Sequence, residues 1–423
     1  MSGAYVRADA GNGLTVMTET MPGVRSASVG VWVRTGSIHE QPSEMGVSHL
    51  LEHMVFKGTT RRTARDLALV LERVGGSLDA YTTREHTCYT ARVLDEHLDL
   101  AVDVLADLVV DPLLRAEDLD LEREVVLEEI STVDDTPDDL VFDLHAAALF
   151  GDHPYGYSIL GTRETVKSLT AEDLRRVHSR EYRRTNLVIA AAGSVQSDRF
   201  MESVKRGFDR VPNGREQVGV PPLAELQPRE ERVQRSAAQT HIVMGTRVFG
   251  HGDPRRYALV MLCNAFGGGM SSRLFQRVRE ELGLAYSVHA FQSFYQHAGV
   301  CGVYVGTRPD WADRAANVIA EECSTLVRDG LTQDELDDVK GQVKGHVVLS
   351  LESSSSRMHR LAGTELYDEP YLEIDEIMRR VDAVTLDDVH ALAAEFFAPD
   401  CQVVMRLGPD SDAKRERSAS AGM

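Results

Sequence analysis

The chain has 423 residues, of which 43% are hydrophobic and 26% are charged, and its net charge at pH 7 is −20. This composition is typical of a soluble globular protein, and the length exceeds what one hydrophobic core usually organises, so we expect two domains. The acidic balance argues against nucleic-acid binding, and no apolar run is long enough for a membrane span. The five cysteines form no Cys-x-x-Cys pair and the N-terminus lacks a signal-peptide pattern, which predicts a cytoplasmic protein whose thiols have no metal or redox role.

The first regular patterns along the chain are a strand and a helix. Residues 28–36, "SVGVWVRTG", predict a β-strand, because valines alternate with other residues. Residues 42–44, Pro-Ser-Glu, indicate the N-cap and acidic first turn of a helix that contains "VSHLLEHMV". Its apolar residues recur at the spacing of one buried helical face: Val47, Leu50, Leu51, Met54 and Val55.

This helix also carries a possible metal-binding motif. His49 and His53 lie one turn apart, next to the apolar face, with Glu52 beside them. Two imidazoles at this spacing can share one Zn²⁺ ion, and the glutamate can reach a zinc-bound water without being a ligand. His-x-x-Glu-His is the inverted form of the zinc-protease motif His-Glu-x-x-His. The alternative, two surface histidines on an ordinary core helix, has odds of about one in ten.

A zinc site of this kind takes a third protein ligand and keeps one position open for water. The segment "DLEREVVLEEISTVDD", residues 120–135, predicts a helix with many carboxylates, which alone would indicate only a solvated acidic face. Glu122 and Glu129, however, are seven residues apart and lie on one side of this helix, beside Val125 and Val126.

The chain contains an internal repeat with an offset of 215 residues. Residues 168–193 and 383–408 align without a gap, and both predict a Thr-x-x-Asp helix start, at Thr170 and Thr385, then an amphipathic helix, a turn and an apolar strand ending in glycine. The same offset places residues 243–251 over the strand at 28–36.

Each half is therefore expected to be an α+β structure, and the two halves are expected to be homologous domains, each a mostly antiparallel sheet packed with helices. Between the halves lies a segment rich in Pro and Gly, which predicts a linker, and the C-terminal segment is polar and small, which predicts disorder. The predicted boundaries are 1–210 for the catalytic domain, 211–228 for the linker, 229–408 for the second domain and 409–423 for the tail.

The pattern His-x-x-Glu-His, followed about 75 residues later by Glu, resembles the inverted-zincin metallopeptidase family of mitochondrial processing peptidase, pitrilysin and insulin-degrading enzyme, and in particular its short bacterial members. The resemblance implies that His49, His53 and Glu129 bind one Zn²⁺ per chain. It further implies that Glu52 is the general base on the zinc-bound water, whereas Glu122 orients a ligating imidazole. The fold it implies is the duplicated α+β structure.

Residues 75–93, "GGSLDAYTTREHTCYTARV", resemble the family's substrate-binding edge strand, to which an extended peptide is added by main-chain hydrogen bonds. The implied substrate-binding residues are Asp79, Ala80 and Tyr81. The family usually has Asn at this position, so Asp79 departs from the family pattern. The departure concerns the side chain and not the main-chain pairing.

In the second half, residues 267–286 resemble the family segment that carries an Arg and a Tyr seven residues apart. The resemblance implies that Arg279 and Tyr286 are catalytic residues that bind the scissile region and stabilise the oxyanion. Taken alone, this segment is an ordinary helix end with Gly283 as the stop. The second half has no His-x-x-Glu-His motif, and the repeat places Asn264 under His49.

The sequence thus predicts a zinc-dependent endopeptidase that hydrolyses unfolded or short peptides. Pitrilysin-type relatives enclose the substrate between two halves that are each about as large as this chain, which favours a homodimer and leaves a heterodimer with an inactive homologue open. One alternative function is that of a non-catalytic homologue serving as a structural or partner subunit. Another is a peptidase specialised for maturing a single peptide product.

Overall fold

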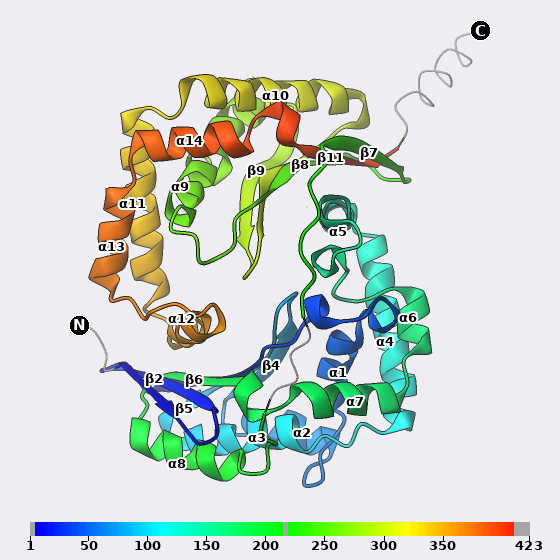
Figure 1. The fold of residues 1–423 in the computed structure, drawn as a ribbon, viewed down its shortest axis with the longest axis vertical. Helices are drawn as coiled ribbons and strands as arrows, with labels where there is room; N and C mark the ends of the chain where they lie inside the picture. The colour runs from blue at the N-terminus through cyan, green and yellow to red at the C-terminus, as the bar shows by residue number, and fades with distance from the viewer. Residues whose placement is uncertain (1–4, 215–218, 410–423) are drawn as a thin grey trace. The chain divides into compact units, whose positions relative to one another are not determined.

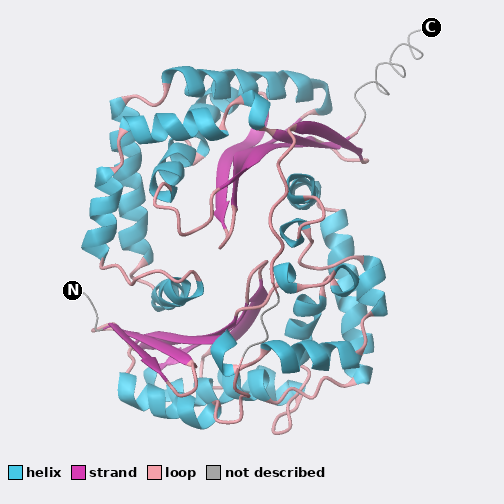
Figure 2. Ribbon diagram, in the orientation of Figure 1, coloured by secondary structure: helices cyan, strands magenta, loops and turns pink. Residues whose placement is uncertain are grey.

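The computed structural model describes residues 5–214 and 219–409, which form two β-sheets surrounded by helices (Figures 1 and 2). The chain divides into two compact units, and each is described by itself. The first unit comprises Met1–Ser131, Tyr157–Pro222 and Val347–Ile374, and the second comprises Thr132–Gly156, Leu223–His346 and Asp375–Met423.

The first unit contains a six-stranded sheet of order β1-β2-β6-β3-β5-β4. All neighbouring strands are antiparallel except β2 and β6, and β4 lies at an edge. The strands are β1 (Tyr5–Asp9), β2 (Thr15–Thr20), β3 (Ser26–Val33), β4 (Ser77–Thr82), β5 (Thr87–Leu94) and β6 (Leu187–Gly193). The helices are α1 (Val47–Val55), α2 (Ala64–Glu72), α3 (Leu98–Val110), α4 (Ala116–Asp134, whose last turn belongs to the second unit), α6 (Arg163–Ser168), α7 (Ala171–Glu181), α8 (Ser197–Gly207) and α12 (Ser354–Leu366).

The second unit contains a five-stranded sheet of order β7-β11-β8-β10-β9, in which only β7 and β11 are parallel. The strands are β7 (Arg229–Gln234), β8 (Thr240–Val248), β9 (Ala285–Phe294), β10 (Gly299–Thr307) and β11 (Val403–Gly408). The helices are α5 (Pro137–Phe150), α9 (Arg256–Gly267), α10 (Ala312–Asp329), α11 (Gln333–Ser350, whose last turn belongs to the first unit), α13 (Ile374–Ala383, whose first residue belongs to the first unit) and α14 (Leu386–Phe396).

The structure confirms the predicted α+β class and the internal repeat. In both halves a threonine caps the repeated helix: Thr170 accepts from the N–H of Asp173, and Thr385 accepts from the N–H of Asp388. Each capped helix leads to a buried strand, β6 or β11, that pairs antiparallel with β3 or β8. The predicted strands at 28–36 and 243–251 are β3 and β8, which both begin slightly earlier.

Each sheet has a second face that a helix from the other half of the chain covers. In the first unit, α12 packs on β2, β3 and β6, on the face opposite α3 and α8 (Figure 1). In the second unit, α5 packs on β8 and β11. These two helices hold equivalent places in the repeat, because α5 follows α4 as α12 follows α11.

The compact units therefore differ from the contiguous domains predicted at 1–210 and 229–408, because each unit exchanges one helical segment with the other half of the sequence. The physical reason is that an uncovered sheet would expose its second apolar face to water. Residues 211–214 and 219–228 of the predicted linker form neither helix nor strand, and all of the predicted tail but Pro409 lies outside the described residues.

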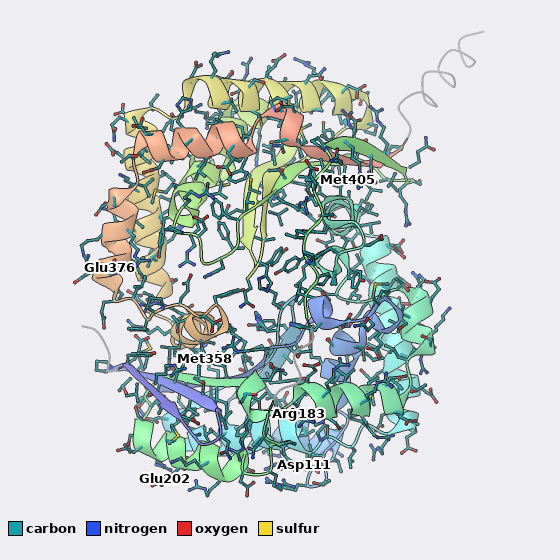
Figure 3. The ribbon with its side chains drawn as sticks, in the orientation of Figure 1. Asp111, Arg183, Glu202, Met358, Glu376 and Met405 are labelled. Carbon is teal, nitrogen blue, oxygen red and sulfur yellow. The ribbon has the colours of Figure 1, made fainter. Side chains whose placement is uncertain are left out.

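The contact of α12 with the first sheet is apolar in its centre and polar at its margin. Met358, which Figure 3 labels on α12, is buried with other residues in one hydrophobic cluster. Its buried members are Met17, Trp32, Cys88, Val188, Ala190, Ala192, Met358, Leu361, Ala362 and Leu366. At the margin, Ser354 forms a buried 2.9 Å hydrogen bond with Ser28, and Arg357 pairs with the buried carboxylate of Glu19.

None of the helices in the described ranges combines the length and the hydropathy that crossing a membrane requires. All five cysteines are free thiols; four of them are buried and Cys401 is half-buried.

If α12 stabilises the first unit by covering its sheet, removing one of its buried side chains should destabilise that unit. We expect Leu361→Ala to lower the free energy of unfolding by about 2–5 kcal/mol, because Leu361 is fully buried and truncation leaves a cavity. Leu349→Ala is the matched control, since Leu349 lies in the same exchanged segment and is 65% exposed. Urea denaturation measures both variants, and equal midpoints would contradict the expectation.

Candidate metal centre

Helix α1 carries the motif and is anchored by one apolar face. The predicted buried residues are all confirmed, since each is at most 1% exposed: Val47, Leu50, Leu51, Met54 and Val55. The predicted start at Pro42–Glu44 is wrong, because these residues form a separate 3₁₀ turn and α1 begins at Val47 with Gly46 as N-cap. Gly46 has φ +89°, and a Cβ there would lie 2.6 Å from the Leu160 carbonyl oxygen, so the chain turns here in a conformation that favours glycine.

Helix α4 supplies the carboxylates. Leu119 and Val126 are buried against the core, and Glu122 and Glu129 project from a neighbouring stripe of the helix toward α1. The side chain of Glu122 is 8% exposed, whereas that of Glu129 is 40% exposed. The two carboxylates predicted from their seven-residue spacing therefore both reach the motif helix.

His49, His53 and Glu129 each offer one atom to a common point, and these atoms all lie within 4.8 Å of one another. Nε2 of His49 is 3.7 Å from Oε2 of Glu129, and Nε2 of His53 is 3.6 Å from Oε1 of the same carboxylate. These distances are too long for hydrogen bonds. Tetrahedral zinc with bonds of 2.0–2.1 Å would place its ligand atoms about 3.3 Å apart, so both histidine-to-carboxylate distances are close to those that the ion requires.

Metal binding requires neutral imidazoles, and the surroundings of both histidine rings can be compared with this requirement. Burial, with the nearby His53, lowers the pKa of His49 to about 4, so His49 is neutral at pH 7. Nδ1 of His53 lies 3.1 Å from Oε2 of Glu122. A proton on this Nδ1 donates to the Glu122 carboxylate and leaves Nε2 with its lone pair for the ion.

Lys57 is a residue of this site that the sequence analysis did not single out. Its ammonium group pairs with Oε1 of Glu122, the carboxylate that holds His53. The backbone carbonyl of Lys57 accepts a 3.2 Å hydrogen bond from Arg115, so the residue is held at both ends. Lys57 follows His53 by four residues, a helical spacing that could have indicated a shared partner.

Glu52 lies beside the ligands and is 8% exposed. The hydroxyl of Thr82 donates a 2.5 Å hydrogen bond to its Oε2. Burial raises the pKa of Glu52, whereas the Thr82 hydroxyl and His53 act in the opposite direction. The result is a poorly solvated carboxylate with one oxygen fixed, which is the kind of group that can accept a proton from a nearby water.

The predicted substrate-binding residues lie on β4, the edge strand of the first sheet. Side chains alternate along it: Ala80 packs against the core that contains α1, whereas Tyr81 packs against the cluster on the α12 face. The carboxylate of Asp79 accepts a 2.9 Å hydrogen bond from the N–H of Ala80. Thr82, at the end of this strand, was missed by the sequence analysis, although the same alternation places it on the side of Ala80.

Arg279 and Tyr286 belong to the second unit, where the structure brings them together. Arg279 lies on a π-helical segment, Phe275–Glu281, and Tyr286 on β9. The guanidinium of Arg279 stacks 4.5 Å from the Tyr286 ring centre and 4.6 Å from that of Phe275. Tyr286 is 77% exposed. The metal-site residues belong to the first unit, so the predicted role of this pair in catalysis stays a prediction.

The second half carries no corresponding motif. Asn264, which the repeat places under His49, lies on α9, and its side-chain amide donates a 2.8 Å hydrogen bond to the Val260 carbonyl of its own helix. The only group of three potential metal ligands in the described residues is the one at α1 and α4.

Comparison with known proteins agrees with these observations. The Streptomyces coelicolor relative, named an uncharacterized zinc protease, is 40% identical over 415 residues, which cover 96% of this chain and 90% of the relative. A Bacillus subtilis protein of the same description is 41% identical over 92% of this chain and 95% of its own length.

Among solved structures, one described as a peptidase M16 inactive domain from Pseudomonas fluorescens superimposes with a TM-score of 0.90 at 21% identity, covering 96% of this chain and 98% of that one. A protease from Helicobacter pylori gives a TM-score of 0.88 at 22% identity over 97% of this chain and all of that one. These two similarities support the fold. Residues 15–163 match the family model "Insulinase (Peptidase family M16)" and residues 168–343 match "Peptidase M16 inactive domain", so the chain belongs to peptidase family M16.

Proposed function

We propose that the protein is a zinc-dependent endopeptidase that hydrolyses peptide bonds in unfolded or short peptides. The convergence of His49, His53 and Glu129 on one point beside the buried carboxylate of Glu52 carries this proposal. The relatives named zinc proteases support it independently of the geometry.

In this proposal His49, His53 and Glu129 hold one zinc ion per chain. The ion supplies Lewis acidity, which makes a water a better nucleophile and polarises the peptide carbonyl. Glu122 accepts a hydrogen bond from the Nδ1–H of His53 and so fixes the orientation of that ring, and Lys57 pairs with the Glu122 carboxylate.

Glu52 is the proposed proton acceptor and donor. Its carboxylate takes a proton from the attacking water and then delivers it to the leaving amine, so one group serves first as base and then as acid. The hydrogen bond from Thr82 restrains Oε2, and the low exposure of Glu52 limits competition from solvent. Arg279 and Tyr286 are proposed to stabilise the oxyanion of the tetrahedral intermediate.

The substrate is proposed to bind as an extra strand at the free edge of β4, next to Asp79, Ala80 and Tyr81. Main-chain pairing at a sheet edge requires an extended peptide, which favours unfolded or short substrates over folded proteins. A peptidase that matures a single peptide product would use the same edge and differ only in its specificity.

The proposed assembly is a cytoplasmic homodimer with one zinc ion per chain, and a heterodimer with an inactive homologue is the alternative. The length of the chain supports this part of the proposal, because it is about half of a pitrilysin-type enzyme. The rival function, a non-catalytic structural or partner subunit, is less favoured, because all three ligands and Glu52 are present together in this chain.

Replacing Glu52 by Gln should abolish peptide cleavage and leave zinc binding intact. The amide keeps the shape of the side chain and cannot accept the proton, so kcat should fall by about 10²–10⁴-fold. Cleavage of a quenched fluorescent peptide library, with zinc measured by elemental analysis on both proteins, tests this. A wild-type protein that neither binds zinc nor cleaves any peptide would favour the non-catalytic alternative.

Replacing Glu122 by Gln should weaken zinc binding by about 10–100-fold, because the ring of His53 loses a charged acceptor. Glu124→Gln is the matched control, since Glu124 lies on the same helix with an exposed side chain. Zinc dissociation constants from competition with a chromophoric chelator give the comparison. Equal constants for the two variants would show that Glu122 has no part in holding the ion.

Replacing Thr82 by Val should lower kcat by about tenfold, because a hydrogen bond to a carboxylate is lost at nearly constant side-chain volume. Thr82→Ser keeps the hydroxyl and should retain most of the activity. Steady-state kinetics on one cleavable peptide, with zinc content measured in parallel, distinguishes the two variants. If Val and Ser give the same kcat, the hydrogen bond does not contribute to the reaction.

A further inference from the structure

A third buried carboxylate, besides those of Glu52 and Glu122, lies at the start of α1 and has no part in the chemistry proposed above. Glu40 is 4% exposed and precedes α1 by several residues. Its Oε2 accepts a 2.8 Å hydrogen bond from the backbone N–H of Gly46, and its Oε1 accepts one of 2.8 Å from the N–H of Ser48. In the described part of the chain Glu40 forms no ion pair. Its carboxylate instead binds the backbone N–H groups at the start of α1.

Helix α1 needs such a partner. The first four N–H groups of a helix have no acceptor within it, and a side chain at the N-cap usually supplies one. Here the N-cap is Gly46, which has no side chain, and the first turn contains no acidic residue. Glu40 thus supplies from outside both the hydrogen bonds and the negative charge that a helix N-terminus favours.

The same turn is held on its other side. The hydroxyl of Thr165 donates a 2.7 Å hydrogen bond to the carbonyl of Met45, and the backbone of Gly46 lies directly against the Leu160 carbonyl. Burial raises the pKa of Glu40 to about 7, whereas the two N–H donors lower it. The carboxylate therefore bears a desolvation cost that only its contacts with α1 offset.

We propose that Glu40 is a positioning residue that fixes the start of α1 and thereby the separation of His49 and His53 from Glu129. The inference rests on the proposed function, because it assigns a role to Glu40 in the same metal centre. The helix has nine residues, and His49 lies in its first turn, one residue after Ser48. A shift of the helix start would therefore move His49 directly, and the two metal-binding imidazoles would no longer keep their distances to Glu129.

The test is Glu40→Gln, which preserves shape but directs an NH₂ group at one of the two N–H donors. In the zinc-free protein, at a pH well above the Glu40 pKa of about 7 so that the carboxylate is ionised, the amides of α1 should exchange hydrogen about tenfold faster in Glu40→Gln, because a hydrogen bond to a charged acceptor is lost. The zinc dissociation constant should rise by about tenfold, and kcat should fall more than KM changes. Amides of α3, in the core of the same unit, should exchange as in the wild type.

Glu44→Gln is the matched control, since Glu44 lies in the same turn region and pairs with the half-exposed side chain of Arg176 at 2.6 Å. Glu40→Asp keeps the charge but has a shorter side chain. Its amide exchange rates in α1 are therefore expected to lie between those of the wild type and those of Glu40→Gln. If Glu40→Gln does not fold, the same comparison is made between Glu40→Asp and Glu44→Gln. Exchange in α1 and zinc affinity equal to those of Glu44→Gln would overturn the proposal.

The two hypotheses fail differently. If the wild-type protein binds no zinc, the proposed function fails. Amide exchange in the zinc-free protein still shows whether Glu40 stabilises the start of α1. If the wild-type protein binds zinc and cleaves peptides while Glu40→Gln behaves as Glu44→Gln does, only the role of Glu40 fails.

Discussion

The arrangement of α1 against α4 depends on one electrostatic constraint. Each of two imidazole nitrogens lies 3.6–3.7 Å from one oxygen of the Glu129 carboxylate, too far for a hydrogen bond and close enough for facing lone pairs to repel. His49 is largely buried and its pKa is lowered to about 4, so at pH 7 it carries no positive charge that would pair with the Glu129 carboxylate. A cation of suitable size resolves the conflict, which is why the donor geometry supports a metal rather than a hydrogen-bonded cluster.

The two halves of the chain use one scaffold twice. Both halves contain the threonine-capped helix, the buried strand that follows it, and a sheet with one parallel pair at the same relative position. Only the first half carries the ligands, whereas Asn264 in the second half is satisfied within its own helix. The exchange of α5 and α12 gives each sheet its second cover, so the fold of each compact unit depends on both halves of the sequence. The half without ligands thus contributes a helix, α12, to the compact unit that holds them.

Much of this could be predicted from the sequence, because the relevant signals are periodic or local. The apolar face of α1, the shared side of Glu122 and Glu129, and the capped helices of the repeat all follow from residue spacing along one element. The start of α1 was predicted wrongly, because Pro42–Glu44 has the composition of an N-cap but forms its own turn, and Gly46 gives no cap signal. Two features could not be predicted: the exchange of α5 and α12, and the hydrogen bonds from the start of α1 to Glu40. Both connect elements that no sequence periodicity relates, so only the folded chain reveals them.

Thr82 connects the two parts of the proposed reaction. It lies on β4, the strand to which a peptide is proposed to add, and its hydroxyl restrains Glu52, the proposed base. Alternation along the strand directs Ala80 and Thr82 toward the α1 side, while the backbone edge of β4 remains available for pairing with a substrate strand. A displacement of β4 on peptide binding would reach the Glu52 carboxylate through this 2.5 Å hydrogen bond. In the proposal above, Glu40 fixes the start of α1. Glu52 would then be held from two directions, by Thr82 of β4 and by the fixed start of its own helix.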